Sequence, residues 1–369
     1  MERSRQQQPR RRTPSAWRRR GSLRAAAPPA CALALASLIL CACGAGAQTG
    51  TTASAYSSPA AYTAAGPAPL SIAEPPCGAA SARTAATTLL AAAENIYRGE
   101  LSSPEVRADA SQVEHYAPLL RALESGNRAA VGEAVTSLVY SGTHIVRLRV
   151  SRGGAVLSDV GGPYIIAPVS GRLRNNGREL GRYVLSVQDD LGYVKLESRY
   201  LGLPLILRAG GPGGTRIPLE GTIPAGKAIP STGPVRYGGA TREAISFTAK
   251  AFPSGSLGIT LIVPVPVDTT AGCTAIRVAE LGHVGARMWG HFASVGAPAS
   301  AYAHVVGALT SVLVYVRAGS RHLAASVGPG PSRLPDSGVV VYRGVHYRVA
   351  SFPAHGPMGA VRVYMLIRP

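Results

Sequence analysis

The chain has 369 residues, and its 38 lysine and arginine residues against 19 aspartate and glutamate residues give a formal net charge of +19. Much of this charge lies at the N-terminus, because without residues 1–42 the remaining 29 basic and 18 acidic residues leave +11. This remainder is dispersed along the chain, whereas a nucleic-acid-binding surface gathers its basic residues in one patch or stripe. The composition therefore argues against nucleic acid as a partner and favours a modest attraction to anionic lipid or wall polymer.

The N-terminus has the order of a secretory signal. Nine arginines and a single acid lie within the first 24 positions, and an uncharged, mostly apolar run follows as far as Cys43. After Pro29 this run holds about fourteen residues, fewer than the roughly 20 that a membrane-spanning helix needs. It is therefore typical of the h-region of a signal peptide.

The signal ends in Leu40-Cys41-Ala42-Cys43, which resembles the bacterial lipobox. The resemblance implies that Cys43 becomes the lipidated first residue of the mature protein, carrying palmitate-type acyl chains. Two or three such chains, at about 0.8 kcal/mol per buried methylene, anchor a protein stably without a transmembrane helix. We expect an exported protein held at the outer face of the cell membrane. Ordinary secretion after cleavage near Ala45 or Ala47 is the alternative.

Two further cysteines, Cys77 and Cys273, remain after this processing. Each lies a few residues before a predicted helix, and an even pair outside the cytoplasm favours a disulfide. Such a bond would join the start of one module to the start of another, and two unpaired thiols are the alternative. The scarcity of lysine and the abundance of alanine, glycine and proline are typical of a GC-rich, actinobacterium-like source.

Residues 44–76 are a low-complexity stretch of small residues and proline, too poor in large apolar groups to fold alone. They are expected to form a tether between the lipid and the folded part. Three helices are predicted next, because apolar residues recur at spacings of three and four. Their apolar faces cover 89–97, 113–123 and 130–138, and the third helix is expected to begin at Asn127.

The hydrophobic period then changes from 3.6 to 2. Apolar residues and arginines alternate at 145–150, as in a half-buried strand. A glycine turn at 152–154 leads to a second predicted strand, and two more follow before residue 188. Helices followed by antiparallel strands predict an α+β fold.

The second half of the chain contains an internal repeat at an offset of 105 residues. The matched pairs include Tyr237 and Tyr342, Ser246 and Ser351, Leu261 and Leu366, and, when four residues are dropped, Arg208 and Arg317. A third, more distant copy is predicted at 136–187. Each copy is expected to contain a helix, a short strand, a hairpin and two alternating strands.

The segments HIVRLRVSRGGAVLSDVGG and GRYVLSVQDD resemble the extracytoplasmic PAS-like sensors known as Cache domains. The resemblance covers 111–267, with the C-terminal copy as a second candidate module. It implies an α+β fold with an antiparallel sheet and a small-molecule pocket between the sheet and its covering loops. The predicted domains are a signal peptide at 1–42, a tether at 43–76, a first module at 77–267 with an internal repeat unit at 190–267, and a second module at 268–369.

Polar residues of the first module are the candidate ligand contacts. Arg147 and Arg149 share one strand face, where they either meet a carboxylate or phosphate bidentately or form a solvated surface. Gln188, Asp189 and Asp190 follow a strand, and they either hold a cation or a ligand amine or cap the next helix.

Two tyrosines complete the candidate set. Tyr164 follows a Gly-Gly-Pro sequence that is either a ligand-facing loop or a tight connection. Tyr183 lies in the GRYVLSV strand, which carries part of the resemblance to Cache domains.

Catalytic motifs are not recognised in the sequence. The stretch from Gly221 to Lys227 fits the first seven positions of a P-loop, but Ala228 stands where a magnesium ligand is required. The sequence lacks zinc-helix and nucleophile-elbow motifs as well. We therefore expect a protein that is not an enzyme and needs no cofactor or metal.

The resulting prediction is a lipoprotein that senses a small molecule through its PAS-like modules. Sensors of this kind usually feed a signalling domain, and none follows in this sequence, so the signal is expected to pass to a separate partner. Two alternatives stay open. One is a structural or accessory protein of the cell envelope that binds another protein, and the other is an envelope hydrolase with widely dispersed residues.

Overall fold

The computed structural model describes residues 74–369 except 142, 164, 218–222, 224–227, 253–254 and 358. The predicted signal peptide and Cys43 lie outside the described residues, as does nearly all of the predicted tether.

The predicted helices are present with one difference. The described helices are η2 (Gly78–Ala80), α1 (Ser81–Leu101), α2 (Pro104–His115), α3 (Ala117–Ser125), α4 (Arg128–Tyr140), α5 (Asp190–Tyr200), α6 (Cys273–Ser294) and α7 (Ala299–Thr310). The single helix expected around 113–123 is divided at Tyr116, where the backbone is extended. Pro118 has no N–H with which to continue the hydrogen bonds of α2, which explains the break. Asn127 caps α4 as predicted, because its side chain accepts a hydrogen bond of 3.1 Å from the Ala130 N–H.

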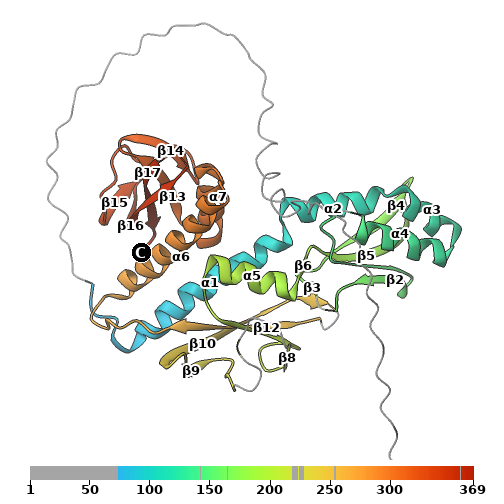
Figure 1. Ribbon diagram of the computed structural model, residues 1–369, viewed down its shortest axis with the longest axis horizontal. Helices are drawn as coiled ribbons and strands as arrows, with labels where there is room; N and C mark the ends of the chain where they lie inside the picture. Colours follow the sequence, from blue (N-terminus) through green and yellow to red (C-terminus); the bar gives the residue numbers. More distant parts are fainter. Residues whose placement is uncertain are drawn as a thin grey trace, which may run out of the picture. The chain divides into compact units, whose positions relative to one another are not determined.

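The described strands form three larger sheets and a small one (Figure 1). The first sheet contains β1 (Arg147–Arg152), β2 (Ala155–Gly161), β4 (Val169–Asn175) and β5 (Arg178–Ser186). The second contains β7 (Leu205–Ala209), β8 (Thr215–Arg216), β9 (Gly233–Tyr237), β10 (Ala240–Ala249) and β12 (Leu257–Pro264). The third contains β13 (Leu313–Ala318), β14 (Arg321–Ala325), β15 (Gly338–Tyr342), β16 (Val345–Gly356) and β17 (Gly359–Ile367). The small sheet joins β3 (Ile165–Ile166), β6 (Gln188–Asp189) and β11 (Ala251–Phe252).

All strand pairs among the described residues are antiparallel, which confirms the predicted α+β class. The three larger sheets share one order, with strands arranged β2-β1-β5-β4, β8-β7-β12-β10-β9 and β14-β13-β17-β16-β15. In each, the first and last strands lie side by side, the second strand lies outside the first, and the penultimate strand lies outside the last. This common order supports the internal repeat predicted from the sequence.

Matched side chains of the repeat have matched contacts. Ser246 and Ser351 each donate a hydrogen bond to the carbonyl oxygen of the residue fifteen positions earlier, over 2.5 Å and 2.7 Å. Arg208 donates to the Ile229 carbonyl oxygen over 2.7 Å, and Arg317 donates to the Pro331 carbonyl oxygen over 3.0 Å. In both copies the arginine therefore holds the connection between the second and third strands onto the sheet.

The strand register corrects one part of the predicted alignment. Leu205 pairs with Leu261 in the second sheet, and the position that matches Leu205 in the third sheet, Val314, pairs with Met365. The counterpart of Leu261 is thus Met365, one residue before the predicted Leu366. The stretch from Ser246 to its pairing partner Thr260 is one residue longer than the stretch from Ser351 to its pairing partner Tyr364, which an ungapped comparison of the sequences cannot show.

Two hydrophobic clusters fill the spaces between helices and sheets. One joins α1, α5, α6 and α7 to the second and third sheets, and includes Leu89, Tyr193, Leu261, Met288 and Val363. The other packs α2, α3 and α4 on the first sheet through residues such as Leu119, Leu138 and Leu148.

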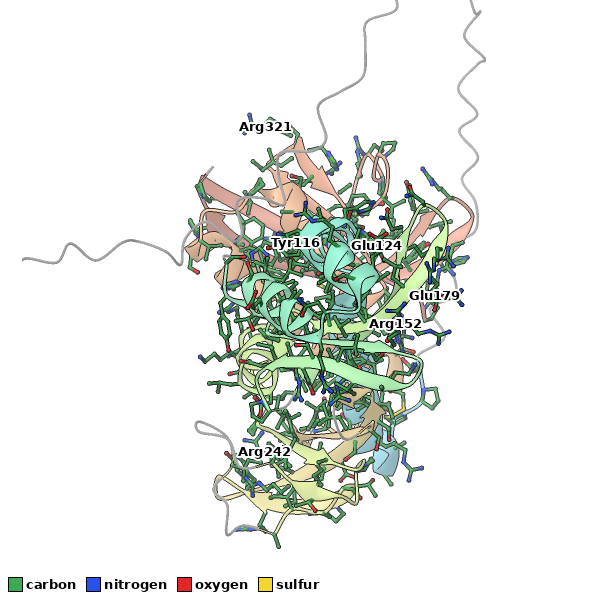
Figure 2. The ribbon with its side chains drawn as sticks, turned by 90° about the vertical axis from the view of Figure 1, so that its right-hand side faces the viewer. Tyr116, Glu124, Arg152, Glu179, Arg242 and Arg321 are labelled. Carbon is green, nitrogen blue, oxygen red and sulfur yellow. A yellow bond between two sulfur atoms is a disulfide. The ribbon has the colours of Figure 1, made fainter. Side chains whose placement is uncertain are left out.

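Polar contacts at the rim support the packing of α3 on the first sheet. Arg152 donates to the Leu123 carbonyl oxygen over 2.9 Å, and Glu124 accepts a hydrogen bond of 2.6 Å from Asn175 (Figure 2). A cation at the carboxyl end of α3 also meets the negative end of the helix dipole.

The predicted disulfide between Cys77 and Cys273 is present. It joins the segment that leads into α1 to the first residue of α6. Next to it, the Glu74 carboxylate accepts a hydrogen bond of 2.7 Å from the Thr274 N–H, which lowers the pKa of Glu74. None of the helices in the described part of the chain is both long and apolar enough to cross a bilayer.

Candidate functional site

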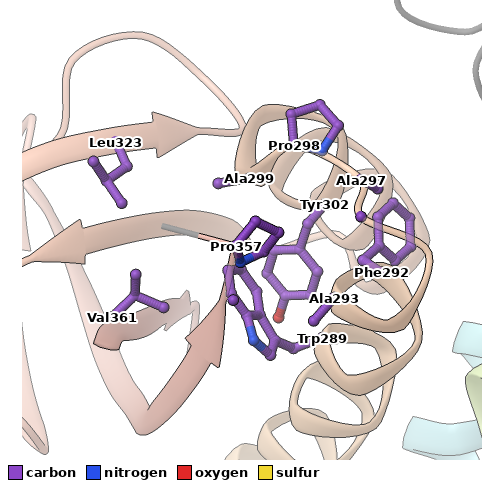
Figure 3. A pocket seen from close by; sticks show the side chains of 12 residues that line it. Trp289, Phe292, Ala293, Ala297, Pro298, Ala299, Tyr302, Leu323, Pro357 and Val361 are labelled. Carbon is purple, nitrogen blue, oxygen red and sulfur yellow. The ribbon is translucent and has the colours of Figure 1, made fainter. Parts of the chain in front are cut away.

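An apolar cavity of about 210 Å³ lies in the C-terminal unit, by which we mean α6, α7 and the third sheet (Figure 3). It opens where the end of α6 and the start of α7 meet the turn between β16 and β17. The helices contribute Trp289, Phe292, Ala293 and Tyr302 to its wall, and the strands and their turn contribute Leu323, Pro357 and Val361.

The local sequence explains how the two helices come to line one cavity. Trp289, Phe292 and Ala293 are spaced three and four residues apart and so share one face of α6. The helix ends just before Gly296, which adopts a left-handed φ of 69°. Pro298 then precedes the first turn of α7. This short turn reverses the chain, so that Tyr302 on α7 returns to the face that carries the aromatic residues of α6.

The aromatic rings pack edge to face. The ring centres of Trp289 and Tyr302 are 4.8 Å apart at an interplanar angle of 80°, and those of Phe292 and Tyr302 are 5.8 Å apart at 81°. Such pairs contribute about 0.5 to 1.5 kcal/mol beyond the apolar area that they bury. The rings of this part of the wall therefore pack against one another, and the wall is formed without a ligand.

The polar atoms of these aromatic residues are bound to the protein backbone. Tyr302 donates its hydroxyl hydrogen to the Gly285 carbonyl oxygen over 2.9 Å, and the Trp289 indole N–H donates to the His355 carbonyl oxygen over 2.8 Å. Burial raises the pKa of Tyr302 well above its usual range, so the phenol stays neutral. The cavity consequently presents ring faces and aliphatic carbon, and it suits an apolar ligand better than a charged one.

Arg147 and Arg149 do meet a carboxylate, but it belongs to the chain itself. Asp159 lies opposite Arg149 in the hairpin of β1 and β2. The Arg147 Nε is 2.8 Å from Asp159 Oδ1, and the Arg149 Nη2 is 2.5 Å from Asp159 Oδ2. The hydrogen bond from Arg147 is the main cause of a lowered pKa of Asp159. Both guanidinium groups also lie near the ring of Phe252, at 5.0 Å and 3.7 Å from its centre.

Arg147 has a further role in the loop after β2. Its Nη1 donates to the carbonyl oxygens of Gly162 and Pro163 over 2.8 Å and 3.0 Å. Tyr164, the next residue, lies outside the described residues. The arginine thus holds the Gly-Gly-Pro connection against β1, as in the tight-connection alternative.

Tyr183 points toward the helices that cover the first sheet. Its hydroxyl donates to Glu114 over 2.8 Å, and burial raises its pKa. A Cβ atom at Gly171 would lie 2.3 Å from the Tyr183 ring, so the missing side chain at Gly171 makes room for it. The tyrosine is part of the packing between sheet and helix.

The acidic cluster after β5 is divided among several structural contacts. Asp189 caps α5 by accepting a hydrogen bond of 2.6 Å from the Gly192 N–H, as the capping alternative predicts. Gln188 donates a hydrogen bond of 3.0 Å to Glu100, and Asp190 accepts a hydrogen bond of 2.9 Å from the N–H of Leu191. The structure does not bring these residues together with the cavity of the C-terminal unit.

A buried acid on α5 escaped the sequence analysis. Glu197 is fully buried and accepts a hydrogen bond of 2.6 Å from Tyr193. Its other oxygen, Oε2, has no partner among the described residues. Burial raises the pKa of Glu197 to about 8, so the side chain is mostly neutral at physiological pH.

The residues of the cavity were also missed, although the sequence contains a signal for them. The chain has two tryptophans and four phenylalanines, and Trp289 and Phe292 bring one of each within a single helical turn. Gly296 and Pro298 then mark a helix end and a restart, with Tyr302 four residues further on. Scarce aromatic residues gathered at a helix reversal indicate a lined hollow or a tight core, and only the fold distinguishes the two.

No family model matches the chain, and no curated protein matches it. Two solved structures are similar to it. The periplasmic domain of Vibrio cholerae LuxQ has 9% identity over 78% of this chain and 100% of that chain, with a TM-score of 0.16. The ligand-binding domain of Mlp24, solved with asparagine, has 9% identity over 78% of this chain and 95% of that chain, with a TM-score of 0.15. Scores of this size carry no argument about the ligand of this chain.

Proposed function

We propose that the protein is a non-catalytic extracytoplasmic lipoprotein that binds an apolar small molecule in the cavity of its C-terminal unit. The observation that carries the proposal is the preformed aromatic wall of Trp289, Phe292 and Tyr302 around about 210 Å³ of space. A preformed apolar hollow avoids the ordering cost that binding otherwise incurs.

The chemistry of the wall favours an apolar ligand over an amino acid. An amino acid would bring two charged groups, and the polar atoms of Trp289 and Tyr302 already have backbone partners. Unpaired charges in an apolar site cost several kcal/mol. A small aromatic or aliphatic molecule meets no such penalty.

The location and the sensing role are parts of the same proposal. The disulfide between Cys77 and Cys273 supports an oxidising, extracytoplasmic environment. The lipobox-like sequence before Cys43 supports a lipid anchor at the outer face of the membrane. The units are Cache-type modules in this proposal, and the occupied state of the cavity is passed to a separate partner protein.

The site differs in place from the pocket that the resemblance to Cache domains implies. In the C-terminal unit, tyrosines and Leu334 occupy the space between the third sheet and the connection that follows β14. The ring of Tyr315 approaches Gly330 so closely that a Cβ atom at that position would lie only 2.4 Å from it. The proposed ligand therefore binds at the junction of α6 and α7, where Leu323 and Val361 of the sheet complete the wall, and not under the connection that follows β14.

Thermal unfolding of the full chain with indole and with toluene tests the proposal, and asparagine serves as the polar control. Binding to the folded state alone raises the Tm in proportion to the logarithm of probe concentration above Kd. We expect a rise with the apolar probes that is absent from Ala293→Leu, which places a larger side chain in the cavity. Ala275→Leu is the matched control, because Ala275 lies on an exposed part of the same helix.

Two results would overturn the proposal. One is an unchanged Tm with both apolar probes at concentrations near their solubility limits. The other is an equal rise in the original chain and in Ala293→Leu, which would place the probes elsewhere.

A structural or accessory role in the envelope is the second candidate. It is favoured by the filled space under the third sheet, because the tyrosines there leave the packing complete without a ligand. In that role the modules would bind another protein through their surfaces.

A further inference from the structure

The outer edges of the second and third sheets differ at matched positions. β9 is the edge strand of the second sheet, and β15 is the edge strand of the third (Figure 1). The repeat places Pro234 on Val339 and Arg236 on Val341. Proline and charged side chains on an edge strand prevent further strands from pairing with it. The edge formed by β9 has both protections, and the edge formed by β15 has neither.

The two valines are solvent-exposed. Val339 is 51% exposed and Val341 is 55% exposed, whereas Val340 between them packs against the tyrosine cluster on the other face of the sheet. About half of the surface of each valine is therefore open to solvent in the isolated chain. This exposure is better explained by a surface that another chain covers.

The backbone of the same two residues is open to a further strand. Arg343 and Gly344 both have positive φ and form a two-residue turn that joins β15 to β16. The residues that flank such a turn, here Tyr342 and Val345, form a hydrogen-bonded pair. Because hydrogen-bonding direction alternates along a strand, Val339 and Val341 direct their N–H and C=O groups away from β16.

We propose that β15 pairs antiparallel with β15 of a second copy of this chain, about a two-fold axis at Val340. Val339 of one copy then faces Val341 of the other, so the two copies exchange four backbone hydrogen bonds and bring together the four exposed valines. An isologous contact of this kind requires a strand that is complementary to itself, and β15 meets that requirement. The two third sheets become one continuous antiparallel sheet.

The charges at the two ends of β15 favour a second copy over an unrelated strand. Asp336 precedes the strand, and its side chain is 66% exposed although it contacts Arg362. Arg343 follows the strand. Antiparallel pairing about Val340 places the segment that enters β15 in one copy close to the turn that leaves β15 in the other. Each Asp336 then lies beside an arginine of the second copy, and this happens at both ends of the interface.

Sedimentation of the full chain across a range of concentrations tests the pairing. We expect a reversible dimer whose dissociation constant rises at least about tenfold in Val341→Arg, which copies Arg236. Val339→Pro, which copies Pro234, should have the same effect, since the N–H that it removes points away from β16. Val156→Arg is the matched control, because Val156 is 40% exposed on β2, an edge strand of the first sheet, and this variant should dimerise normally.

Cysteine cross-linking tests the register independently of affinity. In the proposed pairing the two copies of residue 340 form a non-hydrogen-bonded pair with Cα atoms about 4.5 Å apart, within the range of a disulfide. The two copies of residue 341 are about 8 Å apart, beyond that range. Val340→Cys should therefore form a covalent, reductant-sensitive dimer under oxidising conditions, and Val341→Cys should not become cross-linked at this position. A chain that is monomeric at all concentrations would overturn the proposal, also in the case that a segment of another protein pairs with β15. Equal cross-linking of Val340→Cys and Val341→Cys would overturn it as well.

Discussion

The second and third sheets have the same strand order, and they differ in the helices that precede their first strand and in the residues of their edge strands β9 and β15. In both, an arginine on the first strand and a serine on the penultimate strand bind the connection that crosses the sheet. In the second unit, formed by α5 and the second sheet, α5 leads into β7 after four residues. In the C-terminal unit α7 is placed between α6 and β13, and the apolar cavity lies at the junction. The comparison teaches that shared residues maintain the fold, whereas the candidate binding surfaces lie where the copies diverge.

Of the variants considered, the removal of one aromatic residue from the cavity wall is expected to reduce the free energy of unfolding most. Trp289→Ala deletes a side chain that is 9% exposed, together with its hydrogen bond to His355. Large-to-small changes of this kind cost about 3 to 5 kcal/mol. Urea unfolding of the variant measures the loss. A loss below about 1 kcal/mol would mean that the indole is not packed as described, and Ala275→Leu on the exposed part of α6 serves as the control.

The matched arginines allow a direct test of the shared framework. Arg208 is 9% exposed and bonds both Thr260 and Ile229, so Arg208→Met should reduce the free energy of unfolding by about 2 to 3 kcal/mol. Arg317→Met should reduce the free energy of unfolding by about 1 kcal/mol. The smaller loss is expected because the Pro331 and Ser332 carbonyl oxygens, which Arg317 binds, are more accessible to water than the partners of Arg208. Chemical denaturation of both variants gives the two values. The same value, or the reverse order, would contradict the assigned difference in burial.

Glu197, the fully buried acid on α5, is a further difference between the second unit and the C-terminal unit. The described residues of the C-terminal unit include no fully buried acid. The pKa of Glu197 is about 8 in the folded state, against 4.5 ordinarily. Between these pH values the folded protein keeps a proton that the unfolded chain releases. This group therefore makes stability fall as pH rises from 4.5 to 8, by at most about 1.4 kcal/mol per pH unit.

Glu197→Gln should remove this slope while leaving an acceptor for the Tyr193 hydroxyl. The free energy of unfolding of the variant and the original chain, measured from pH 5 to pH 8, should diverge as pH rises, with the variant more stable. Glu94→Gln, on the outer side of α1, provides the control and should keep the original slope. Parallel curves for Glu197→Gln and the original chain would contradict the neutral buried state.

The matched serines are expected to give the smallest difference. Ser246→Ala removes hydrogen bonds to both Ser231 and Thr260, and should cost about 1 kcal/mol. Ser351→Ala removes a bond to Asp336 in a more exposed setting, and should cost about 0.5 kcal/mol. Thermal unfolding of the pair measures both. A stabilising effect in either variant would show that the serine does not hold the crossing connection.

Much of the fold could be predicted because local patterns carry it. Apolar spacing located α1, α3 and α4 but not α7, Asn127 and Asp189 marked helix starts, and the offset of 105 residues pointed to sheets of one strand order. The pairing of Cys77 with Cys273 followed from position and parity. Pro118 carried the signal for the one broken helix, and it was overlooked.

The candidate site was much harder to predict, because it depends on contacts between distant segments. The partner of Arg149, Asp159, is ten residues away and lies opposite it in a hairpin, so the register of the turn could have identified it. The ring of Phe252 comes from more than one hundred residues away, and a local pattern does not reveal it. Likewise, the turn at Pro357 closes the cavity from a segment far from Trp289.

The bond between Cys77 and Cys273 encloses the first and second sheets in one covalent ring of the backbone. A protease that cuts the backbone once between these cysteines therefore opens the ring without separating the two pieces. The nicked protein would run as a single band on a denaturing gel without reductant and as two bands after reduction. In surroundings that contain proteases, such a clipped molecule would keep its C-terminal unit joined to the residues before Cys77.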